Sequence, residues 1–148
     1  PWGGYADQFQ NALNNLDSES RFLKYTGHEP FEKLHNAYST ADAFLFASSC
    51  ENLPNILIEA MAAGLPIACS DRGPMPEVLG DAGVYFDPFD PNSIVNALLN
   101  LAKDHALRTR LADLAWKRAQ AYSWERCAQD TFKFVENVVR CHKGKRDV

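Results

Sequence analysis

The sequence lacks three features that would mark its class at once: an excess of basic residues, a long apolar run and paired cysteines. Its formal net charge of -4 argues against a nucleic-acid-binding surface. No apolar run approaches the roughly 20 residues that span a bilayer, and no signal peptide is recognisable. The four cysteines stand far apart, so we expect reduced thiols in a cytoplasmic protein. With 148 residues, 46% of them hydrophobic, we expect one globular domain.

Strand-like and helix-like segments alternate along most of the chain. Short apolar runs predict strands at residues 21–25, 43–46, 66–69 and 84–86, and those at 43–46 and 66–69 are typical of strands buried on both faces. Helical periodicity predicts helices at residues 5–16, 30–40, 54–63, 92–103, 106–121 and 124–140, with one helical turn at 76–79. Asp104 and Ser123 are the expected caps of the last two helices. This alternation predicts an α/β fold, a Rossmann-like three-layer α/β/α sandwich with a parallel sheet.

Two carboxylates, Glu51 and Glu59, are the most informative residues. They flank a helix that Pro54 opens and Gly64 closes, and this helix is apolar nearly all round, so we expect it to be buried. An unpartnered charge there is costly, which indicates that Glu59 meets a partner such as a hydroxyl-rich ligand. Glu51 follows the strand at 43–46, and ligands of parallel sheets bind at that carboxyl edge.

The start of this helix is suited to a phosphate, because its first backbone N–H groups are unpaired and its dipole is positive there. Pro54 has no N–H, so Asn55 and Ile56 are the expected donors. Glu59 lies about 6 Å further along the axis and can accept two vicinal hydroxyls, as of a ribose. Glu51 would then accept hydroxyls of a second sugar, which describes a sugar nucleotide. From these residues alone, an alternative without a ligand fits equally well, in which Glu51 is an ordinary loop carboxylate and Glu59 a solvated helix residue.

A longer pattern surrounds the two carboxylates. Residues 47–55 read Ala-Ser-Ser-Cys-Glu-Asn-Leu-Pro-Asn, and residues 59–66 read Glu-Ala-Met-Ala-Ala-Gly-Leu-Pro. This run resembles the signature of the retaining GT-B glycosyltransferases of family 4 (group 1). Further matching stretches are residues 34–42, 71–78, 80–84, 87–88 and 123–124. The resemblance covers nearly the whole chain.

The resemblance implies a function and a set of site residues. In that family the first Glu contacts the transferred sugar and the second binds the nucleotide ribose, roles that fall here on Glu51 and Glu59. The positions implied to hold the rest of the donor are Asn52, Leu53, Asn55 and Ile56, with Gly27 and His28 beside the base. The implied reaction is retaining transfer of a hexosyl unit from a UDP-, GDP- or ADP-sugar to an acceptor hydroxyl, in polysaccharide or glycolipid biosynthesis. Neither a metal nor a cofactor is expected, and the sequence has no Asp-x-Asp motif.

The chain also departs from the family pattern. Ala47 replaces a Pro, Asn52 a Gly and Pro74 a Gly. The family's Gly-Arg-x-x-x-x-Lys-Gly stretch and its N-terminal acceptor domain are absent from this sequence. We therefore expect residues 1–141 to form the C-terminal, donor-binding domain of a GT-B enzyme, without its first strand and inactive alone. Residues 1–5 are expected to be a loop, and residues 142–148 a frayed basic tail.

Other functions stay open on the sequence. A sugar-nucleotide epimerase half and a non-catalytic sugar-nucleotide-binding module fit the same residues. The basic tail leaves room for peripheral contact with the inner face of a membrane. Trp124, Phe132 and Phe134 are expected to pack rather than to hold a sugar, and Arg72 is expected to be a solvated loop residue.

Overall fold

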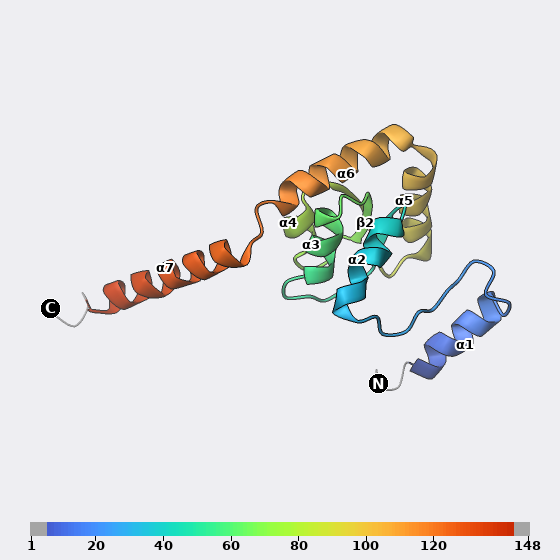
Figure 1. The fold of residues 1–148 in the computed structure, drawn as a ribbon, viewed down its shortest axis with the longest axis horizontal. Coiled ribbons are helices and arrows are strands. Elements are labelled where there is room, and N and C mark those ends of the chain that lie inside the picture. The colour runs from blue at the N-terminus through green and yellow to red at the C-terminus, as the bar shows by residue number, and fades with distance from the viewer. Residues whose placement is uncertain (1–5, 144–148) are drawn as a thin grey trace. The chain divides into compact units, whose positions relative to one another are not determined.

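A computed structural model describes residues 6–143 (Figure 1). The chain forms two compact units, one up to Leu34 and one from His35 onward, and the boundary falls inside helix α2 (Phe31–Thr40). The loop expected at residues 1–5 lies outside the described residues, as do residues 144–148 of the expected tail.

The first unit contains helix α1 (Ala6–Leu16) and an irregular segment in place of the strand predicted at residues 21–25. The strand prediction was wrong because these backbone donors are used elsewhere. The carboxylate of buried Asp17 accepts the N–H groups of Arg21, Phe22 and Leu23 at 2.9, 2.7 and 2.7 Å. Burial alone would raise the pKa of Asp17, but the three N–H donors together lower it.

The second unit is built on a parallel sheet of strands β1 (Phe44–Phe46), β2 (Ile67–Ser70) and β3 (Gly83–Phe86), in that order. Phe44 pairs with Ile67 across β1 and β2, and Ile67 pairs with Gly83 across β2 and β3. The predicted parallel sheet is thereby confirmed, with strand boundaries shifted by at most one residue.

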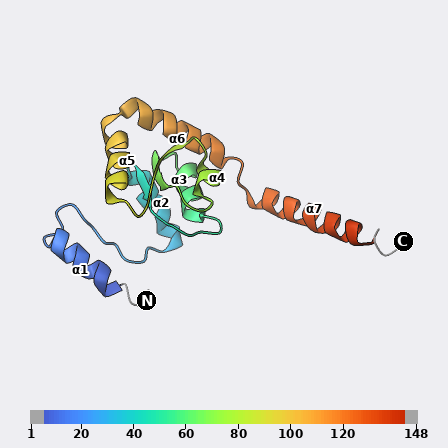
Figure 2. The same cartoon turned by 180° about the vertical axis from the view of Figure 1, so that it is seen from behind.

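Helices cover both faces of this sheet (Figures 1 and 2). They are α3 (Asn55–Ala62), α4 (Met75–Leu79), α5 (Pro91–Lys103) and α6 (His105–Ala119). On β2, Ile67 and Cys69 join a core cluster with residues of α3, α4 and α6. Ala68 faces the other way, into a cluster with residues of α5 and Leu111 of α6. Because successive side chains of a strand point to opposite faces, β2 is buried on both, and the three-layer α/β/α prediction is confirmed.

Strand β1 differs from the prediction that it is buried on both faces. Phe44 and Phe46 are half-buried and pack against the first cluster, with their stacked ring centroids 6.0 Å apart, whereas Leu45 is 42% exposed. Leu45 is exposed because β1 lies at the edge of the three strands. Helix α5 covers the face of the sheet on which Leu45 lies, but it packs on β2 and β3.

The predicted helix caps are present. Asp104 caps α6 by accepting the N–H of Leu107 at 2.8 Å, and the Ser123 hydroxyl accepts the N–H of Arg126 at 3.2 Å. Helix α3 ends before Gly64, whose φ of +70° is the left-handed conformation that favours glycine.

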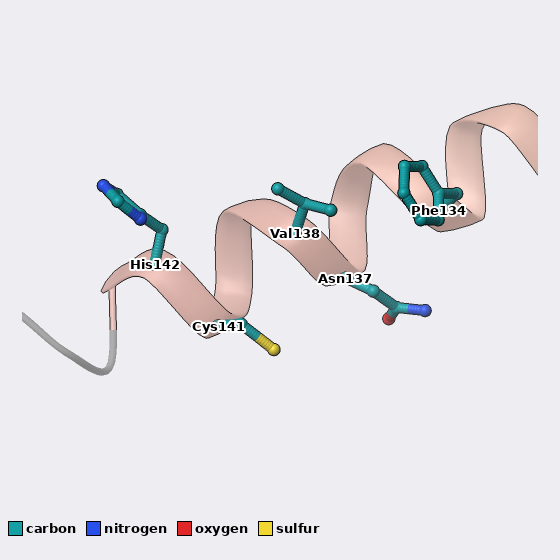
Figure 3. A pocket seen from close by; sticks show the side chains of 5 residues that line it. All are labelled: Phe134, Asn137, Val138, Cys141 and His142. Carbon is teal, nitrogen blue, oxygen red and sulfur yellow. The ribbon is translucent and has the colours of Figure 1, made fainter.

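Helix α7 (Trp124–Lys143) carries an apolar stripe that is exposed. Trp124, Phe132 and Phe134 are 80%, 74% and 69% exposed, so the expectation that they pack was wrong for this structure. The helix continues to Lys143, three residues beyond the predicted end. A hollow of about 320 Å³ is lined by residues of this one helix alone, Phe134, Asn137, Val138, Cys141 and His142. Figure 3 shows the side chains of these five residues. Within residues 6–143 no helix is long and apolar enough to cross a membrane.

Replacement of Met61 by Ala tests the core. Met61 is fully buried in the first cluster, so we expect Met61→Ala to lower the free energy of unfolding by about 2–5 kcal/mol. The matched change on the exposed stripe, Phe132→Ala, should alter it by less than about 0.5 kcal/mol. Urea unfolding measures both, and a large loss for Phe132→Ala would mean that the stripe is covered in solution.

Thiol labelling tests the burial of β2. All four cysteines are free, and Cys50, Cys127 and Cys141 are exposed. Burial raises the pKa of the Cys69 thiol to about 12, so it stays protonated and shielded at pH 8. We expect iodoacetamide to modify three cysteines in the native protein and Cys69 only after unfolding, as read by mass spectrometry. Rapid native labelling of Cys69 would contradict the double coverage of β2.

Candidate functional site at the carboxyl edge of the sheet

The loops that follow the three parallel strands lie at one edge of the sheet. The loop after β1 carries Glu51, and the loop after β2 carries Gly73. A Cβ atom added at Gly73 would lie 4.0 Å from the backbone nitrogen of Glu51, so these two loops are adjacent. The loop that carries Glu51 therefore lies at this edge, beside the loop after β2.

Glu51 is half-buried and is held by a hydroxyl rather than by a cation. The Ser48 hydroxyl donates to Oε1 of Glu51 at 2.7 Å. Its second carboxylate oxygen has no hydrogen-bond partner among residues 6–143, and no Lys or Arg in that range forms an ion pair with it. Glu51 therefore keeps one oxygen free to accept a hydroxyl from a ligand.

The start of α3 presents backbone donors. Pro54 precedes the helix, and its carbonyl accepts the N–H groups of Leu57 and Ile58 at 3.0 and 3.1 Å. Of the two expected donors, Asn55 gives its N–H to the Leu53 carbonyl at 2.9 Å, whereas the N–H of Ile56 has no acceptor among the described residues.

The N–H groups of Asn52 and Leu53 likewise have no protein acceptor in the described part of the chain. Both residues are exposed, as are Asn55 and Ile56. The loop and the first turn of α3 thus form a set of unsatisfied donors beside a helix N-terminus, an arrangement that attracts an anion.

Helix α3 is buried on one side only, contrary to the prediction. Leu57, Ala60 and Met61 are buried, but Ile56 is 52% exposed and Glu59 is half-buried. The helix packs against α4 and α6, so only the side toward those helices and the sheet is covered.

Glu59 has the partner that its burial demands, and that partner is Tyr38 of α2. The Tyr38 hydroxyl donates to Oε2 of Glu59 at 2.8 Å. Burial, together with the bond to Glu59 and its negative charge, raises the pKa of Tyr38, so the hydroxyl remains a donor. The sequence reasoning missed Tyr38, because its hydroxyl lies on an apolar helix face and 21 residues from Glu59. No cation pairs with Glu59 among residues 6–143.

Arg72 lies in the loop after β2 and is exposed, as expected, but it is also ion-paired. Its guanidinium contacts Asp71 (Nε to Oδ1, 3.1 Å) and Asp87 (Nη2 to Oδ2, 2.9 Å), and it lies 6.0 Å from the ring centroid of Phe89. The Phe89 N–H and then Arg72 lower the pKa of Asp87. This ion-pair cluster links the ends of β2 and β3, so the positive charge of Arg72 is compensated by protein carboxylates.

The remaining predicted site residues, Gly27 and His28, belong to the first unit. Both are exposed, and Gly27 has a φ of +74°. Glu51, Asn52, Leu53, Asn55, Ile56 and Glu59 all belong to the second unit. Among the side chains of the described residues, no three of His, Cys, Asp or Glu are grouped to hold a metal ion.

Comparison with known proteins gives concordant matches. The family model described as "Glycosyl transferases group 1" matches residues 2–104. The O-antigen chain mannosyltransferase B of Escherichia coli is 31% identical over 128 residues, covering 86% of this chain and 34% of the relative. A D-inositol 3-phosphate glycosyltransferase of Corynebacterium jeikeium is 29% identical over 130 residues, covering 86% and 31%. The chain thus spans about a third of the length of the curated relatives it matches.

Among solved structures, a sucrose-phosphate synthase from Thermosynechococcus elongatus superposes with a TM-score of 0.79 at 24% identity. The match covers 91% of this chain and 34% of that chain. It confirms the fold expected from the sequence.

Replacement of Arg72 tests the cluster between β2 and β3. In Arg72→Gln we expect the pKa of Asp87 to rise, yet to stay below its ordinary value because the Phe89 N–H remains. A depressed carboxyl pKa adds stability above the unfolded pKa, and this is lost as the pH falls through the folded pKa. The free energy of unfolding of the variant should therefore fall less steeply as the pH is lowered through the acid range. A carboxyl NMR titration measures the pKa, and an unchanged value would contradict the ion pair.

Proposed function

This chain belongs to the group 1 glycosyl transferases, and we propose that it is the part that binds the sugar donor for a retaining transfer. The donor would be a nucleotide-diphospho-sugar, and a hexosyl unit would pass to an acceptor hydroxyl with its anomeric configuration kept. The bond between the anomeric carbon and the distal phosphate oxygen breaks, and the nucleoside diphosphate leaves with the bonding electron pair. A bond between that carbon and the acceptor oxygen forms, and the departing phosphate takes up the proton of the acceptor hydroxyl.

One observation carries the proposal: unsatisfied backbone donors at the start of α3 lie between two carboxylates that have no cationic partner in the described part of the chain. The free N–H groups of Asn52, Leu53 and Ile56 suit a diphosphate. The two carboxylates suit neutral hydroxyl groups, since a carboxylate can only accept hydrogen bonds. We assign the transferred sugar to Glu51 and the ribose to Glu59, with Asn55 beside the phosphates and Gly27 and His28 beside the base.

The chemistry proposed for these residues is positioning and electrostatic stabilisation. Backbone dipoles aimed at the diphosphate stabilise the negative charge that grows on it as the glycosidic phosphate bond breaks. Glu51 orients the sugar through its free oxygen while Ser48 holds the other. The proposal includes no metal and no cofactor.

The acceptor is assigned to protein outside these 148 residues. The curated relatives are about three times as long as the matched region, so their chains include further sequence. We propose that this further sequence binds the acceptor, that the present chain alone is inactive, and that the whole enzyme acts in the cytoplasm, with any membrane contact peripheral.

Two carboxylate variants separate the assigned roles. We expect Glu59→Ala to weaken binding of the free nucleoside diphosphate at least about tenfold, equivalent to about 1.4 kcal/mol. Glu51→Ala should leave that binding unchanged and weaken only the intact sugar nucleotide. Amide chemical-shift titrations of the 148-residue chain with UDP, GDP and ADP and with their hexose conjugates measure both effects.

The matched control is Glu77→Ala, because Glu77 is an exposed glutamate on α4 whose side chain has no assigned role. It should change neither affinity. Equal loss of nucleoside diphosphate binding in the Glu51 and Glu59 variants would reject the division of roles. Nucleotide-induced shifts that spare the loop 51–56 and Glu59, or no shifts with any nucleotide, would reject the donor site in this chain.

A further inference from the structure

We propose that Tyr38 is a positioning residue that holds Glu59 in the orientation needed to accept the ribose hydroxyls, and that it thereby sets the preference of the site for ribose over deoxyribose. This inference rests on the proposed function, because it takes Glu59 as the ribose ligand. It adds a residue of α2 that no sequence pattern assigned.

The geometry leaves Glu59 one protein anchor. Within the described residues, the only hydrogen-bond partner of its carboxylate is the Tyr38 hydroxyl, at 2.8 Å from Oε2. A phenol has one proton to donate, and here it is directed to that oxygen. The second oxygen, Oε1, keeps its full capacity to accept hydroxyls of a ligand.

The anchor itself is fixed by packing. The ring of Tyr38 lies 6.2 Å from that of Phe44, tilted by 57°, and packs on the first core cluster. Phe44 belongs to β1, so the phenol oxygen is positioned by the sheet. Glu59 by contrast lies on the partly exposed side of α3, where a flexible carboxylate would sample several rotamers.

A carboxylate anchored at one oxygen presents the other in a constant direction. Ligand binding then loses less rotamer freedom, and a hydroxyl in the matching place gains more than one displaced from it. An analogue without ribose hydroxyls gains nothing from this order. The Tyr38 hydroxyl should therefore strengthen the binding of ribonucleotides and leave the binding of dideoxynucleotides unchanged. A tyrosine with a merely structural role would not produce this difference.

The experiment measures the dissociation constants of whichever of UDP, GDP or ADP binds, and of its 2′,3′-dideoxy analogue. The proteins are the unchanged chain, Tyr38→Phe, Glu59→Ala and the double variant. We expect Tyr38→Phe to weaken ribonucleotide binding about tenfold, or about 1.4 kcal/mol, and to leave dideoxynucleotide binding unchanged. In the double variant the Tyr38 change should add nothing to the loss caused by Glu59→Ala.

Tyr85→Phe is the matched control. Tyr85 is also a half-buried tyrosine on the first cluster, but its hydroxyl donates to the Gly80 carbonyl at 2.6 Å. Loss of the Tyr85 hydroxyl should leave the ratio of the ribonucleotide and dideoxynucleotide dissociation constants unchanged. Because Tyr38→Phe keeps the ring against Phe44, both variants should fold, and their amide spectra check this.

The outcomes separate the two proposals. Equal weakening of both nucleotides by Tyr38→Phe, an unchanged ratio, or additive losses in the double variant would overturn the role of Tyr38 while leaving that of Glu59 intact. If Glu59→Ala leaves the ratio unchanged, the ribose assignment in the proposed function fails and this inference fails with it. An unchanged chain that binds no nucleotide overturns both.

Discussion

The burial of β2 on both faces is the constraint on which the second unit depends. Its four residues are all buried, with Ile67 and Cys69 on one side and Ala68 on the other. A strand covered in this way must have helices above and below it, and parallel neighbours then require crossover helices. The same arrangement brings the carboxyl ends of all three strands to one edge. The position of the candidate site is thus a consequence of core packing.

At that edge the two glutamates are anchored by hydroxyl groups. Ser48 contacts one oxygen of Glu51, and Tyr38 contacts one oxygen of Glu59. Arg72, the arginine after β2, is held by Asp71 and Asp87. A guanidinium on either glutamate would occupy both oxygens in a fork and neutralise the charge. A hydroxyl orients the carboxylate while leaving its charge and one oxygen available, which suits a neutral, hydroxyl-rich ligand.

The sequence was sufficient for features that depend on local pattern. Apolar runs located β1, β2 and β3, periodicity located the helices, and Asp104 was recognised as a cap because its side chain reaches only three residues ahead. Features that depend on distant neighbours were not predictable. The segment at 21–25 reads as a strand, but the Asp17 carboxylate takes its donors. Leu45 reads as buried, but its strand lies at the edge of the three.

The candidate site shows the same division. The spacing of Glu51 and Glu59 around Pro54 is local, so it could be recognised in the sequence. The hydrogen bond from Tyr38 to Glu59 joins helix α2 to helix α3, 21 residues apart, so it could not. On a helical wheel Tyr38 is simply an apolar residue of α2. The ring of Tyr38 packs against the core, and its hydroxyl donates a hydrogen bond. One side chain can do both because a tyrosine is apolar along its ring and polar at its hydroxyl. Where a half-buried carboxylate has no cation within reach, a tyrosine on a neighbouring apolar face is therefore a partner to look for.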